Sequence, residues 1–162
     1  MLPSNLKGYD MHFNIVTDTA GSKVGELANE LRNYLIPRVH NTYANVDVTI
    51  LVGFRCLPKS YKRRSFIRYI YKDNCLAIDI SVELEDYIKM YKIEQRYHLG
   101  NIFIEYLRKA LIKRTFEGLD NEEFIDNIIK WGKEISIKMD CGQIKVENWF
   151  RDEIDWSSDL DK

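Results

Sequence analysis

The chain is poor in the residues that would cross-link, kink or anchor a protein. Among 162 residues it has three cysteines and three prolines, and nowhere do 18 apolar residues occur together. Cys56, Cys75 and Cys141 are odd in number, widely spaced and free of any C-x-x-C pair, which argues against a disulfide framework and a zinc site. The N-terminal residues also lack the basic region and apolar run of a secretion signal. The sequence therefore predicts a cytoplasmic protein without a membrane span.

An overall excess of charge is also absent. Lys and Arg number 24 and Asp and Glu number 25, so the formal net charge of −1 gives no global attraction to polyanions or anionic lipid. The charges are nevertheless segregated along the chain. Residues 55–72 carry seven basic residues and no acid, whereas residues 147–162 carry six acids and two bases. Any electrostatic function must therefore be local.

What remains is the composition of an ordinary folded domain. The chain is 45% hydrophobic and 30% charged, which is typical of a globular protein and not of a disordered one. A chain of this length can bury a core of its own. We expect a single domain over residues 1–162, with an acidic C-terminal tail at about 147–162.

The apolar spacing predicts which segments are strands and which are helices. Residues 11–16 alternate like a strand, and a helical pattern follows from Val24 until Pro37, which is expected to end or kink that helix near Ile36. Three more alternating segments, at 46–54, 66–71 and 76–82, read as an antiparallel meander. Helical spacing then returns in a short piece from Leu84 and in two longer helices, at 93–111 and about 120–135.

The order β-α-β-β-β-α-α predicts an α+β fold. We expect a four-stranded, mainly antiparallel sheet with the helices packed on one face. The other face of the sheet would then be polar and solvated, and suited to a partner. Its side chains would include Asp47, Thr49, Arg55 and Asp79.

The sequence offers no pattern for catalysis. The histidines, His12, His40 and His98, have no second metal-type ligand at helical or hairpin spacing. The turn containing Gly21, Ser22 and Lys23 does not match the phosphate-binding G-x-x-x-x-G-K-[ST] spacing. Paired carboxylates stand at helix starts, where the helix dipole explains them. We therefore predict no enzyme, and no catalytic, metal-binding or cofactor-binding residues.

The basic stretch from Cys56 to Lys72, CLPKSYKRRSFIRYIYK, allows two interpretations. Basic side chains neutralise phosphates and aromatic rings stack on bases, so this could be a nucleic-acid surface that also uses Tyr61 and Tyr69. It could instead be a solvated or internally paired cationic face, which we favour because the chain lacks the surrounding positive field of nucleic-acid modules. The candidate nucleic-acid-binding residues are Lys59, Lys62, Arg63, Arg64 and Arg68.

The acidic tail is a candidate for binding a basic protein. Tryptophan can supply an interface anchor, and carboxylates can steer the encounter with a cationic partner. The alternative is that the tryptophans of the tail cover the core, which applies to Trp149 more than to Trp156. The candidate partner-binding residues are Asp152, Glu153, Asp155, Trp156 and Asp159.

One long segment carries a family resemblance. CLAIDISVELEDYIKMYKIEQRYHLGNIFIEYLRKALIK resembles the Immunity protein 44 family of bacterial polymorphic-toxin immunity proteins. In that pattern an alternating strand is followed by an acidic and aromatic bend, here residues 82–87, and by a long helix with a Leu-Arg-x-x-Leu-like core, here residues 107–111. The upstream order of elements and the connection containing Leu57 and Pro58 are also similar. The resemblance covers about residues 10–115.

The resemblance implies a non-enzymatic protein of contact-dependent bacterial competition. Such a protein binds the toxin encoded by an adjacent gene and blocks its active site or its access to substrate. If that toxin is a nuclease with a basic cleft, the acidic tail is the natural surface to fill it. The alternative function is a nucleic-acid-binding module that uses residues 55–72.

Overall fold

The computed structural model describes residues 11–17, 23–58, 65–70, 74–138 and 141–150. Its elements follow the chain as β1 (His12–Thr17), α1 (Lys23–Thr42), β2 (Thr49–Leu57), β3 (Phe66–Ile70), β4 (Cys75–Glu83), α2 (Leu84–Ile88), α3 (Lys92–Lys113), α4 (Asn121–Gly132), β5 (Ile135–Lys138) and β6 (Ile144–Glu147). The first four strands form one sheet, and β5 and β6 form a separate hairpin.

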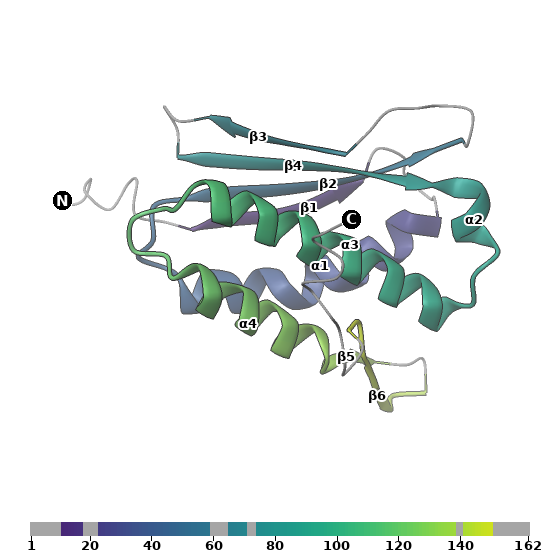
Figure 1. Ribbon diagram of the computed structural model, residues 1–162. Coiled ribbons are helices and arrows are strands. Elements are labelled where there is room, and N and C mark those ends of the chain that lie inside the picture. The colour runs from purple at the N-terminus through teal and green to yellow at the C-terminus, as the bar shows by residue number, and fades with distance from the viewer. Residues whose placement is uncertain (1–10, 18–22, 59–64, 71–73, 139–140, 151–162) are drawn as a thin grey trace.

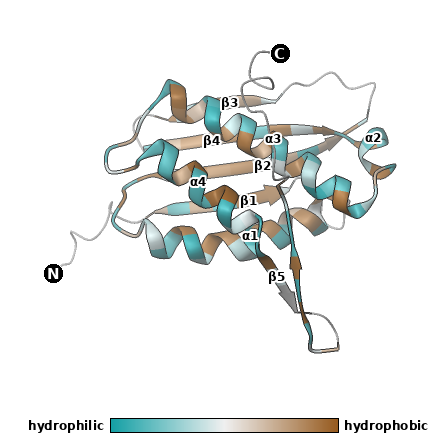
Figure 2. Ribbon diagram, turned by 60° about the horizontal axis from the view of Figure 1, so that its bottom comes forward, coloured by the Kyte–Doolittle hydropathy of each residue, from teal (hydrophilic) through white to brown (hydrophobic). Residues whose placement is uncertain are grey.

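The molecule has two layers, with the four-stranded sheet on one side and α1, α3 and α4 together on the other (Figure 1). Every second side chain of β1, β2 and β4 points into this helical layer, as in Phe13, Val52 and Ile78, which are almost fully buried. Leu31, Phe103 and Ile128 of the helices are buried in the same core, and Figure 2 shows hydrophobic and hydrophilic residues mixed along each of these helices. The expected α+β class is confirmed.

The sheet is mixed, so the predicted meander is wrong. Its strand order is β1-β2-β4-β3, in which β2 is parallel to both β1 and β4 and only the β3–β4 pair is antiparallel. The strand β4 follows β3 in the sequence, but it lies between β2 and β3 in the sheet. Alternation identifies which face of a strand is buried, but it is the same for parallel and antiparallel neighbours. The sequence pattern therefore could not reveal the insertion.

The helix α1 does not end near Ile36, because it continues through Pro37 as far as Thr42. Proline in a helix interior costs about 3 kcal/mol. Beyond the proline, Val39 and Tyr43 are buried against the core. Burial of two large side chains contributes about the same amount or more, so packing outweighs the local penalty.

The last helix is shorter than its apolar spacing predicts. It begins close to residue 120 as expected, and the Asp120 carboxylate caps α4 by accepting the Glu123 N–H at 3.1 Å. It ends at Gly132, however, and Ile135 belongs to β5 and not to the helical stripe. The hairpin β5–β6 has the antiparallel register Ile135↔Glu147 to Lys138↔Ile144.

The segment after β6 packs back onto the helices. Trp149 and Phe150 are almost completely buried, and the backbone N–H of Trp149 donates to the Gly132 carbonyl at 2.7 Å. The interpretation that Trp149 covers the core is therefore confirmed. Phe150, the last described residue, lies on the helical side of the molecule, against Gly100 and Gly132.

Candidate interaction surface

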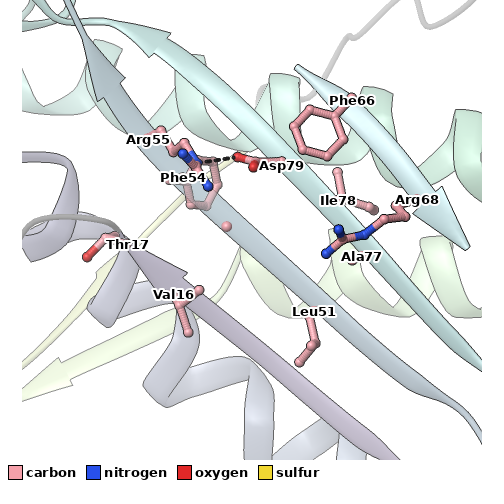
Figure 3. Close-up of a pocket in the computed structure, with 11 residues that line it drawn as sticks. Val16, Thr17, Leu51, Phe54, Arg55, Phe66, Arg68, Ala77, Ile78 and Asp79 are labelled. Carbon is pink, nitrogen blue, oxygen red and sulfur yellow. Dashed lines mark ion pairs between the residues drawn. The ribbon is translucent and has the colours of Figure 1, made fainter. Parts of the chain in front are cut away.

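The face of the sheet that points away from the helices is open, and it holds a shallow hollow of about 220 Å³ (Figure 3). The pairing register arranges its side chains in rows across the four strands. One row runs through Val16, Gly53, Asp79 and Phe66. The next row runs through Asn14, Leu51, Ala77 and Arg68.

Small residues form the floor of this hollow and larger ones form its rim. Gly53 and Ala77 stand at the centre, on the neighbouring strands β2 and β4, and the side chains around them come from all four strands. Figure 3 shows Val16, Leu51, Phe66 and Arg68 around that centre. The hollow is thus a product of side-chain size on a continuous sheet, and it is not a gap between elements.

The open face is more apolar than we expected. The exposed fractions of Val16, Leu51, Phe66 and Ile70 are 49%, 39%, 38% and 37%. Single exposed apolar residues are common on protein surfaces, but a group of them around a hollow is typical of an interaction site. The expectation of a purely polar sheet face is therefore wrong.

The predicted polar residues of this face are present among the apolar ones. Arg55 Nε lies 3.0 Å from Asp79 Oδ1, between the adjacent strands β2 and β4 (Figure 3). Thr49 is half-buried at the start of β2, and Asp47 is exposed just before it. Among the residues described by the structure, Arg68 has no ion-pair partner although it stands on the same face. The charged residues that line the hollow are therefore two arginines and one aspartate.

The outer edge of the sheet at β1 is covered by side chains. The Phe13 N–H donates to His40 Nε2 at 3.0 Å, and the Ile15 N–H donates to Asn14 Oδ1 at 2.9 Å. Arg32 of α1 also donates to Asn14 Oδ1, at 2.8 Å. Because these two N–H groups already have acceptors, β1 is a poorer template for adding another strand. The face of the sheet is more available to a partner than this edge.

The two sets of predicted site residues fall largely outside the described part of the chain. This applies to the whole candidate set in the acidic tail, and to Lys59, Lys62, Arg63 and Arg64 of the basic stretch. Arg68 is described and lies on the open face. Tyr69, proposed as a stacking residue for nucleic acid, faces the other way, and its hydroxyl donates to the Ala110 carbonyl of α3. That role for Tyr69 is wrong.

Within the described ranges, the structure offers little for other classes of site. It contains no group of three or more His, Cys, Asp or Glu side chains that could hold a metal ion. In the same ranges, no helix is both long enough and apolar enough to cross a membrane. Cys56, Cys75 and Cys141 carry free thiols.

Sequence reasoning missed the apolar members of the open face. Leu51 and Gly53 interrupt the polar side of an otherwise alternating strand, and Val16 extends the first strand by one step on its exposed side. These deviations were the available signal. Alternation predicts which face of a strand is buried, and it does not report apolar residues on the opposite face.

The comparisons with known proteins identify the family. The family described as Immunity protein 44 matches residues 11–134, which span β1 to the end of α4. No curated protein and no solved structure matches the chain. The matched region includes every strand of the open face and the three helices that support it. The chain therefore belongs to the Immunity protein 44 family.

Proposed function

We propose that this protein neutralises a cognate bacterial toxin by binding it stoichiometrically, and that the toxin is encoded by an adjacent gene. Binding blocks the active site of the toxin or its access to substrate. The protein itself performs no reaction. It acts in the cytoplasm of the cell that it protects, in the manner of contact-dependent growth inhibition.

The single observation that supports this function is the family match over most of the fold. Membership in an immunity family supports an immunity function in general, and such a function requires a binding surface. The open sheet face, with its apolar rim and its hollow, is a surface of that kind.

The test combines binding with protection. The protein and the product of the neighbouring gene are co-expressed, and the tagged immunity protein is expected to purify with its partner in a 1:1 ratio. Cells that express the toxin alone are expected to stop growing, and co-expression is expected to restore growth. If the neighbouring protein neither binds nor is neutralised, the proposed function is wrong.

We also propose that the acidic tail contacts the toxin if the toxin has a basic cleft. Changing Asp152, Glu153, Asp155 and Asp159 to Asn or Gln is then expected to slow association at low salt, because exposed charges act mainly on encounter. Trp156→Ala is expected to speed dissociation, at a cost on the order of 2 kcal/mol for a buried anchor. Surface plasmon resonance separates the two rates.

Deleting residues 152–162 gives the control for this tail contact. A truncated protein that folds, binds the toxin as tightly as before and protects cells would show that the tail is dispensable. In that case the interface would lie on the open sheet face and the basic region at residues 59–68.

A further inference from the structure

We propose that the open sheet face docks the toxin, through a toxin segment that places apolar side chains in the hollow around Gly53 and a carboxylate on Arg68. This proposal rests on the proposed function, since it names the surface and the chemistry of the partner that an immunity protein must bind. It concerns only residues of β1, β2, β3 and β4.

Gly53 lies in the middle of β2, where glycine is unexpected. It weakens a strand and often marks a place where another chain or ligand approaches closely. Here the fold itself does not require it. A Cβ at position 53 would meet Val16 Cγ2 at 3.8 Å and the Ile78 carbonyl at 3.9 Å, which are ordinary contacts, and its φ is not in the left-handed region. The missing side chain therefore serves the hollow and not the packing.

The rim of the hollow is apolar and exposed. Val16, Leu51 and Phe66 come from three different strands, and each leaves more than a third of its surface exposed. The pairing register holds them on one face around Gly53 and Ala77. A partner that places apolar side chains there removes this surface from water at about 25 cal/mol per Å². A polar partner would gain nothing from the same rim.

Charge decides which protein surface fits. The carboxylate of Asp79 already pairs with Arg55 at 3.0 Å, which leaves Arg68 as the charge on this face without an ion pair to a described residue. Burying an unpaired guanidinium under a partner is costly, whereas a carboxylate opposite it forms a charge-assisted and often bidentate contact. The partner segment is therefore apolar at its centre and acidic where it meets β3.

Nucleic acid fits this face less well than protein does. A single-stranded nucleic acid needs several cations along its backbone and aromatic rings for its bases. Among the residues that line the hollow, Arg68 is the one cation left over, and Phe66 and Phe54 are the only aromatic residues. Phe54 is fully buried, so its ring is not available for stacking.

Gly53→Val is the decisive variant, because it separates folding from binding. Valine favours strands, and a Cβ at this position has only ordinary contacts, so the variant is expected to unfold at the same or a higher temperature. It also fills the hollow, so toxin binding is expected to weaken at least tenfold, mainly through faster dissociation. Ser136→Val is the matched control, since it adds an apolar side chain at an exposed strand position on the β5–β6 hairpin. The control is expected to bind as the wild type does.

Arg68→Glu tests the charge. It is expected to weaken binding at least tenfold, whereas Lys130→Glu, the same reversal at an exposed position of α4, is expected to leave binding unchanged. A screen of single Asp→Arg and Glu→Arg variants of the toxin is expected to yield one that restores binding to Arg68→Glu. Isothermal titration calorimetry measures each pair, and thermal unfolding establishes that each variant is folded.

The outcomes distinguish this inference from the function on which it rests. If the wild-type protein does not bind the toxin, the proposed function fails. If the wild type binds and folded Gly53→Val and Arg68→Glu bind equally well, the docking surface is wrong and the function stands. Two other results would overturn the choice of occupant: a wild-type dimer that Gly53→Val dissociates, or binding of single-stranded RNA or DNA at low salt that Arg68→Glu abolishes.

Discussion

Arg96→Met is expected to lower the free energy of unfolding by about 3–5 kcal/mol, because it leaves the largely buried Glu30 carboxylate without its counter-charge. Arg96 Nε and Nη2 donate to the two oxygens of Glu30 at 2.8 and 2.9 Å, and Nη1 lies 3.3 Å from Glu147. Hydrogen bonding to Glu30 raises the pKa of Arg96, in spite of its burial. Trp149 Nε1 donates to the same Glu30 carboxylate at 2.8 Å. This network therefore joins α1, α3 and the segment that begins with β6.

The chain provides a matched control for this variant between the same two helices. Lys92 of α3 pairs with Glu26 of α1 at 2.6 Å, but these side chains are 57% and 58% exposed. An exposed ion pair contributes at most about 1 kcal/mol, so Lys92→Met is expected to cost less than that. Urea unfolding at pH 7, followed by circular dichroism, compares the two variants. Equal losses for Arg96→Met and Lys92→Met would mean that burial of the network adds nothing.

Gly132→Ala is expected to cost about 3 kcal/mol, although alanine is the better helix former. A Cβ at position 132 would lie 2.1 Å from Cε2 and 2.6 Å from Cδ2 of Phe150, a distance that atoms do not tolerate. The ring must therefore leave its site, and losing a buried aromatic side chain costs about 3–5 kcal/mol. The gain of about 1 kcal/mol in helix propensity offsets only part of this loss. Urea unfolding measures the net effect.

A double-mutant cycle tests the cause of this loss. In a Phe150→Ala background the clash is gone, so Gly132→Ala is expected to be neutral or stabilising there. Gly53→Ala is the control for adding a methyl group at a glycine with ordinary neighbours, and it is expected to leave stability unchanged or improved. If Gly132→Ala is equally costly with and without the Phe150 ring, the docking of this ring does not explain the glycine.

These two predictions concern how the last described residues are held in place. The buried network and the Phe150 site together hold residues 147–150 against the helices, on the side away from the open sheet face.

The candidate site could be predicted only in part. Arg55 and Asp79 were expected on the free face of the sheet, and they are there, paired with each other. The apolar rim was not expected. Val16 lies near the end of β1, and Phe66 lies on β3, which the expected meander placed between β2 and β4. A hollow formed by side chains of four strands depends on the register between them. That register is a property of the assembled sheet.

The sequence by itself determined the type of almost every element, the α+β class and the family, since periodicity and motifs are local. Tertiary structure alone decided that β4 pairs between β2 and β3, that α1 runs through Pro37 and that α4 ends at Gly132. Each of these depends on groups far apart in the chain. A strand can satisfy its backbone hydrogen bonds with a parallel or an antiparallel neighbour. The penalty of a proline can be outweighed by the burial of side chains that follow it in the helix. A glycine can be required by an aromatic ring 18 positions away.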